Sequence, residues 1–431
     1  MRRAPWTWTR LILLASAAAM PLGAAGPALA SPITYSLLTT IAVPASADNN
    51  AGGAFATYDI SYFDPTTQLD YVADRSNAAV DIFSAATNSY VGRIGGTGQL
   101  FTGQQASNAV SGPDGVQVIS QPGQHLVYAG DGNSTLKGFN IAAGNAQIPG
   151  SPLSLGNPAT DRRVDEMSFD PQHNRLLAAN NAADVPFVTL VNTTSNSIIT
   201  KIPFDGTNNT PNAIAGGIEA SDYNPNNGRF YLSIPQIGSS ASNPGGVSEI
   251  DSVTGKVLQT FDLANFGFSS CSPAGLAHGL GNQIMIACGN ASQSILFDPT
   301  ANGGKGAVIA SFTQASGSDQ VWYDPKSQQY FLSARSNPGG PVLGIVDAAT
   351  ATFVENLPTT PADHSVSVDP ISGEVFVPFG GVAGNDVCPS GCIAVFAPNA
   401  ASVPEPGSFT LLAGSMIGLA GLARRWRARV G

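Results

Sequence analysis

Short apolar stretches recur along the chain, and many of them come in pairs separated by an Asp-Pro or Asn-Pro step. Each clear copy has an acidic residue or a histidine, four mostly apolar residues, the Asp/Asn-Pro step and a second apolar stretch. Because proline presets φ and the preceding side chain bonds its own backbone, the step predicts a tight turn between two strands. The clear copies lie at residues 59–65, 165–171, 219–225, 319–325 and 364–370.

The spacing of these turns predicts a sevenfold repeat. Successive turns are 106, 54, 100 and 45 residues apart, and weaker copies at 114–130 and 273–289 divide the two long gaps. The resulting units average about 51 residues, which is close to the size of a four-stranded propeller blade. We therefore expect an all-β, seven-bladed β-propeller over residues 31–402. Two separate domains are the alternative, although no linker-like stretch interrupts the repeat.

The two ends of the repeat predict how the ring closes. The seventh unit stops after the apolar run at 392–396, so its outermost strand is missing. A strand-like stretch at 37–43 has no partner in the first unit. We expect this N-terminal strand to complete the last blade, which leaves no open sheet edge.

Residues 1–30 have the three parts of a secretory signal peptide. Arginines at 2, 3 and 10 form a positively charged segment before the apolar run at 11–20. Ala28-Leu29-Ala30 fits the cleavage site before Ser31. A buried N-terminal helix is the alternative interpretation. A signal peptide implies that the rest of the chain is exported.

The C-terminal residues 403–431 carry a second signal. An uncharged stretch at 407–423 is seventeen residues long, which just reaches the length of a membrane-spanning helix, and basic residues follow it. We expect helices at both terminal signals. The motif residues are Val403, Pro404, Glu405 and Pro406, with Arg424 and Arg425 after the apolar stretch.

This tail resembles the PEP-CTERM sorting signal of Gram-negative bacteria. The resemblance implies recognition by an exosortase, a transient anchor in the inner membrane, loss of the tail and transfer to the cell surface or the extracellular matrix. A plain membrane anchor is the alternative.

The second half of each unit is a strand, a turn led by Asp or Asn, and another strand, as at 190–200, 249–260 and 345–350. With the preceding apolar runs at 230–233 and 374–377, it resembles the YVTN-type seven-bladed propellers over residues 33–398. That resemblance implies a lactonase, a lyase acting on cyclic substrates, or a binding or surface-layer protein. The fold therefore leaves the function open.

Composition and charge narrow the classes of partner. Only 11% of the residues are charged and 48 are glycine, which excludes a coiled coil, while 20 Phe and 10 Tyr can build a core. Without the two terminal signals the chain has 12 basic and 28 acidic residues, a net charge of −16. This charge argues against nucleic acid and anionic membranes as partners. We expect a monomer.

The four cysteines all lie in the exported part, and their even number predicts two disulfides. Cys271 and Cys288 flank a predicted hairpin turn symmetrically, and Cys388 and Cys392 enclose a short turn, so we expect the pairs 271–288 and 388–392. A four-thiolate metal site is the alternative, but the spacing does not suit it.

One position of the repeat carries candidate chemistry. The residues that begin the innermost strands are Asp59, Asp114, Asp165, Glu219, Pro273, Asp319 and His364. Carboxylates gathered at a channel mouth repel one another unless a cation lies between them, and Ca²⁺ or another divalent cation suits such oxygen ligands. The alternative is a purely structural role, in which these side chains cap the turns.

Two classes of function follow. The first is a binding or scaffold protein of the cell envelope or matrix, with an exopolysaccharide or a surface protein as partner. The second is a metal-dependent lactonase or lyase, in which Asp59, Asp165, Glu219 and Asp319 hold the metal and His364 is the catalytic base. The second class needs a ligand pocket at the channel mouth, and the first does not.

Overall fold

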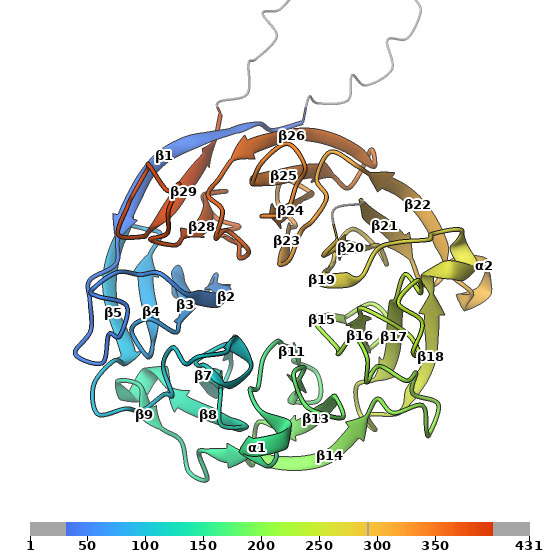
Figure 1. Cartoon of the computed structure of the whole chain (residues 1–431), viewed down its shortest axis with the longest axis horizontal. Coiled ribbons are helices and arrows are strands. Elements are labelled where there is room, and N and C mark those ends of the chain that lie inside the picture. The colour runs from blue at the N-terminus through green and yellow to red at the C-terminus, as the bar shows by residue number, and fades with distance from the viewer. Residues whose placement is uncertain (1–31, 291–292, 400–431) are drawn as a thin grey trace, which may run out of the picture. The chain divides into compact units, whose positions relative to one another are not determined.

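Seven antiparallel sheets stand around a central channel in the computed structural model, which describes residues 32–290 and 293–399 (Figure 1). In six sheets four strands pair in order from the channel to the rim, and the second blade has a fifth short strand. This is the seven-bladed β-propeller that the repeat predicts. The blades are numbered one to seven in chain order, starting from the sheet that contains residue 58.

The two strands of each blade nearest the channel are those that flank the predicted turns. The innermost strands are β2 (Tyr58–Asp64), β6 (Val116–Gln121), β11 (Met167–Asp170), β15 (Ser221–Asn224), β19 (Pro273–His278), β23 (Val321–Asp324) and β27 (Ser367–Val368). The second strands are β3 (Leu69–Asp74), β7 (Gln124–Asp131), β12 (Arg175–Asn180), β16 (Arg229–Ile234), β20 (Ile284–Cys288), β24 (Gln329–Ala334) and β28 (Val375–Phe379).

The two outer strands of each blade form the rim. The third strands are β4 (Ala79–Ser84), β8 (Thr135–Asn140), β13 (Phe187–Asn192), β17 (Gly246–Asp251), β21 (Ser294–Asp298), β25 (Val342–Asp347) and β29 (Cys392–Pro398). The outermost strands are β5 (Ser89–Gly95), the pair β9 (Ala146–Gln147) and β10 (Leu153–Ser154), β14 (Ser197–Pro203), β18 (Val257–Asp262), β22 (Ala307–Phe312), β26 (Thr352–Pro358) and β1 (Tyr35–Ala42).

The helical segments among the described residues are all short. They are α1 (Pro158–Asp161), α2 (Ala301–Gly304) and the 3₁₀ turns at Asn108–Val110, Ile141–Ala143 and Leu263–Phe266.

The Asp/Asn-Pro steps form the turns between the first and second strands of their blades. In each of them the side-chain oxygen accepts a hydrogen bond from the backbone N–H two residues later, at 2.8–3.0 Å. The proline therefore occupies a position where no backbone donor is needed. The turn residues are Asp64, Asp170, Asn224, Asp324 and Asp369.

The N-terminal strand closes the ring as predicted. β1 pairs antiparallel with β29 from Tyr35 opposite Pro398 to Ala42 opposite Cys392, and the two strands lie side by side in Figure 1. The backbone N–H of Asn399 donates to the carbonyl of Thr34 at 2.7 Å, which extends the pairing. The strand begins two residues earlier than the apolar run suggests.

The hydrophobic core lies between the blades. Each of the seven clusters of buried apolar side chains combines residues of two neighbouring blades. Leu177 and Leu190 of blade three, for example, share a cluster with Phe230 and Leu232 of blade four. Each blade thus depends on both neighbours for its stability, which makes ring closure important.

Both predicted disulfides are present. Cys271 pairs with Cys288 in blade five, and Cys388 pairs with Cys392 at the start of β29.

The predicted signal peptide at 1–30 and the tail at 403–431, with their expected helices, lie outside the described residues. Within residues 32–290 and 293–399 no helix is both long enough and apolar enough to cross a membrane. The span predicted at 407–423 is not among them.

Candidate functional site

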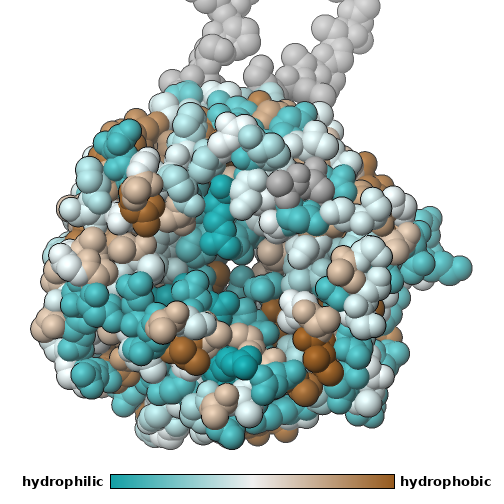
Figure 2. All heavy atoms as spheres, in the orientation of Figure 1, coloured by the Kyte–Doolittle hydropathy of each residue, from teal (hydrophilic) through white to brown (hydrophobic). Residues whose placement is uncertain are grey.

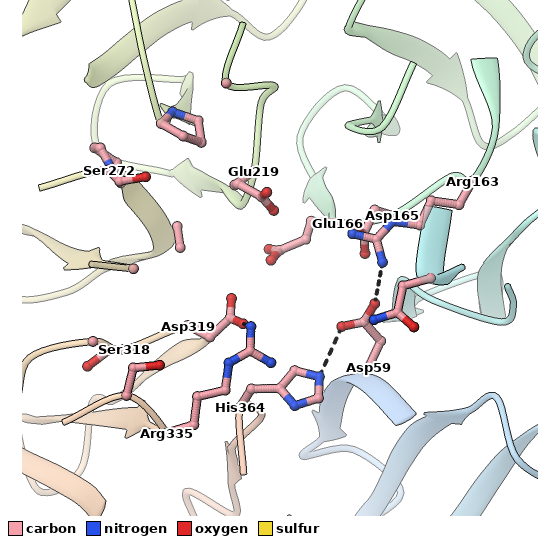
Figure 3. A pocket seen from close by; sticks show the side chains of 18 of the residues that line it. Asp59, Arg163, Asp165, Glu166, Glu219, Ser272, Ser318, Asp319, Arg335 and His364 are labelled. Atoms are coloured by element: carbon pink, nitrogen blue, oxygen red, sulfur yellow. Dashed lines mark hydrogen bonds and ion pairs between the residues drawn. The ribbon is translucent and has the colours of Figure 1, made fainter. Parts of the chain in front are cut away.

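A cavity of about 350 Å³ opens at the end of the channel where the innermost strands begin (Figure 3). Hydrophilic residues dominate the surface around the channel opening in Figure 2. Five of the six ionisable residues that the repeat alignment selects line this cavity: Asp59, Asp165, Glu219, Asp319 and His364. Asp114 is fully buried behind it.

The backbone explains why these side chains meet. Just before four of the innermost strands, the backbone N–H of the aligned residue donates to a carbonyl of the second strand, at 2.8–3.0 Å. The bond recurs at Asp114, Asp165, Glu219 and Asp319, so these residues occupy equivalent positions in their blades. Their carboxylates contact side chains rather than backbone N–H groups in the described residues, so they do not cap turns.

Three arginines that the sequence did not single out are interleaved with these carboxylates. Arg75 pairs with Asp59 and, at 2.5 Å, with Asp114. Arg163 pairs with Asp165 at 2.7 Å and with Asp59 at 3.2 Å. On the other side of the cavity, Arg335 pairs with Asp319 at 2.8 Å.

The surrounding charges shift the pKa values of Asp59 and Asp165 in opposite directions. Burial opposes ionisation of Asp59, but Arg75, His364 and Arg163 outweigh it and hold the pKa of this carboxyl well below its usual range. Burial raises the pKa of Asp165 to about 6 although Arg163 opposes the shift, because Asp59 and Asp319 add negative charge. Asp59 is therefore a fixed anion, whereas Asp165 titrates near neutral pH.

Two further carboxylates of the cavity form no ion pair among the described residues. Glu219 accepts only a 3.3 Å hydrogen bond, from Asn181, and burial together with Asp165 raises its pKa to about 8. Glu166 follows Asp165 in sequence, and its pKa lies well above the usual range because it is buried beside Asp165, Glu219 and Asp319. The repeat alignment missed Glu166, since the other units have no acid at this position.

His364 lies at the cavity wall with both ring nitrogens facing acceptors. Nε2 is 3.3 Å from Asp59 Oδ1, and Nδ1 donates to the carbonyl of Ala362 at 2.7 Å. The ring also stacks on Tyr58, with centroids 4.8 Å apart. Both ring nitrogens thus face groups of the protein, and the role of His364 as the catalytic base stays a prediction.

The cavity does not present a ready set of metal ligands. In the part of the chain that the structure describes, no group of three His, Cys, Asp or Glu side chains lies close enough to hold a metal ion. Three of the predicted ligands, Asp59, Asp165 and Asp319, already pair with arginines. The divalent cation expected from the sequence stays a prediction.

A second cavity of about 220 Å³ lies further along the channel. Its wall contains the aromatic rings of Tyr62, Trp322 and Tyr323 together with His278. Glu166 lines both cavities, so its side chain stands where they adjoin.

Comparison with known proteins identifies the C-terminal signal. Residues 402–428 match the PEP-CTERM protein-sorting motif. The match contains all the predicted motif residues, from Val403 to Arg425. This motif is the signal for processing by an exosortase, and it indicates that the protein is exported through the cell envelope.

The other comparisons bear on the fold. The chain is similar to a solved structure titled Kuenenia stuttgartiensis hydrazine synthase, with 14% identity and a TM-score of 0.58 over 82% of this chain and 97% of that one. At this identity the similarity shows the propeller fold alone. No curated protein sequence matches the chain. The YVTN-type resemblance stays a prediction.

Proposed function

We propose that this protein is a binding or scaffold protein of the cell envelope or extracellular matrix and that its ligand site is the channel mouth. The observation that carries the proposal is the sorting motif attached to a closed propeller. An exosortase-type enzyme would cut the tail while it is held in the inner membrane of a Gram-negative cell. Exopolysaccharides and surface proteins are the partners available at that destination.

The channel mouth supports a binding role because its charged groups are held in place by contacts among themselves. The side chains of Arg75 and Asp114 are almost completely buried, and Arg163 touches carboxylates from three blades. Such a wall keeps its shape when a ligand enters, which lowers the entropy cost of binding. The cavity is also within the size range of small-molecule sites.

A metal-dependent lactonase or lyase is the second candidate. The convergence of Glu219 and Asp319 on one cavity favours it (Figure 3). The pairing of Asp319 with Arg335 and the hydrogen bonds of His364 oppose it. Elemental mass spectrometry of the purified protein separates the two candidates, since the enzyme would retain about one equivalent of metal after dialysis.

The sorting step is tested by replacing Pro404 and Glu405 with alanine. We expect the variant to accumulate in the inner membrane with its tail attached, because the enzyme no longer recognises the motif. The matched control replaces Ser408 and Ser415 with alanine, since both lie in the tail but outside the Val403 to Pro406 segment. Fractionation and immunoblotting measure the outcome. Normal release of the Pro404 and Glu405 variant would overturn the proposal.

A further inference from the structure

Glu166 as a whole residue is 8% exposed, yet its side chain has no hydrogen-bond or ion-pair partner among the described residues. It points into the channel cavity, toward the space that Glu219 and Asp319 also face (Figure 3). Its carboxyl oxygens are not sealed from solvent, so they can be reached through the cavity. A carboxyl that has no partner in the protein can bind a ligand that enters this space.

The charges around the cavity show which kind of ligand fits. The lining holds more carboxylates than guanidinium groups, and the excess is not spread evenly. Asp59, Asp165 and Asp319 each pair with an arginine, whereas Glu166 and Glu219 do not. Burial makes these two glutamates hold protons, and a cation lying between them in the cavity can take the place of those protons.

The geometry favours an organic cation over a metal ion. The described residues contain no cluster of three metal-ligating side chains, and the cavity of about 350 Å³ is far larger than a bare ion. A primary ammonium group has three hydrogen-bond donors, which two carboxylates and a hydroxyl can accept. The hydroxyl-bearing residues Ser272 and Ser318 line the same cavity (Figure 3).

We infer that the channel mouth binds the primary ammonium group of a small organic cation, with the carboxylates of Glu166 and Glu219 as its direct partners. The inference rests on the proposed function, since it specifies the ligand of that same channel site. The arginine-paired side of the cavity then holds the rest of the ligand through polar contacts.

The test compares amines with neutral analogues of the same shape. The probes are ethanolamine with ethylene glycol, putrescine with 1,4-butanediol, and glucosamine with glucose. Isothermal titration calorimetry measures their binding to the exported protein purified from its host. We expect at least one amine to bind about tenfold or more tightly than its analogue, because it makes charge-assisted hydrogen bonds.

The variant Glu166→Gln removes the charge and keeps the shape of the side chain. We expect it to lose about tenfold or more in amine affinity. Asp386→Asn removes the same charge from an exposed loop residue, so its affinity should stay within about twofold of the wild type. Thermal unfolding checks that Glu166→Gln is folded.

The outcomes separate this inference from the proposed function. Equal affinity for amines and neutral analogues, binding of Ca²⁺ alone, or no binding of any probe would each overturn the ammonium site. Full amine affinity in Glu166→Gln would also overturn it. None of these results affects the sorting experiment, whose failure would instead remove the envelope role.

Discussion

Asp70 lies at the interface of blades one and seven, where its Oδ1 accepts a hydrogen bond from Ser367 at 2.7 Å. Burial raises the pKa of Asp70 to about 7, although the bond to Ser367 opposes the shift. Asp363 behaves similarly: burial raises its pKa to about 7 while Ser333 opposes the shift. These carboxyls hold their protons more tightly in the folded state than in the unfolded chain.

These shifts predict that the protein loses stability as the pH rises. Between about pH 4 and 7 the folded state binds more protons than the unfolded state, so the free energy of unfolding falls across this range. In Asp70→Asn the fall between pH 5 and 8 should be smaller by about 2–3 kcal/mol. Urea unfolding at several pH values measures this. A pH dependence identical to that of Asp386→Asn would contradict the explanation.

The residues of the candidate site differ in how far the sequence could predict them. Asp59, Asp165, Glu219, Asp319 and His364 share one position of the sequence repeat, and all five line the cavity at the channel mouth. Glu166 was missed because a single acid beside an aligned acid gives no repeat signal.

Two of the three arginines share an offset within the repeat, since Arg75 and Arg335 each lie sixteen residues after the aligned acid, whereas Arg163 lies two residues before it. Arg75 lies between β3 and β4, Arg163 precedes β11, and Arg335 follows β24. Only the folded ring shows that they pair with the aligned acids. Their presence explains why an acidic ring that suggests a metal site is largely neutralised by the chain itself.

At the scale of elements, β1 contacts two neighbouring blades and so stabilises the closure of the ring. Besides pairing with β29 of blade seven, it contacts blade six through Tyr35. The Tyr35 ring packs edge-on against Phe331 at 5.2 Å, and its hydroxyl donates to Gln329 at 3.2 Å. The position of β1 was predictable from the missing strand of blade seven, whereas its contact with blade six was not.

We expect Tyr35→Ala to lower the free energy of unfolding by about 3–5 kcal/mol, because a large buried side chain is lost at the closure of the ring. Leu37→Ala is the matched control: Leu37 lies on the same strand, is 47% exposed and should change stability by less than about 0.5 kcal/mol. Urea unfolding of the exported protein compares them. Equal stability of the two variants would show that β1 does not secure the ring.

At the scale of the whole molecule, the sequence predicted the architecture because five of the seven units repeat the same Asp/Asn-Pro turn at regular spacing. Even the weak units at 114–130 and 273–289 form blades, with β6 and β7 in one and β19 and β20 in the other. The C-terminal sorting signal could also be predicted from the sequence, since a sorting motif is recognised as a linear sequence. The ligand site could be predicted only in part from the sequence, because it depends on side chains from different blades.

The central claim is that an exported, processed propeller holds a ligand in its channel. Native mass spectrometry of the protein recovered from the cell surface tests this most directly. We predict a chain without the leader and the C-terminal tail, carrying a small organic adduct that the Glu166→Gln protein lacks. A surface protein that retains residues 403–431, or an adduct that persists in Glu166→Gln, would contradict the account.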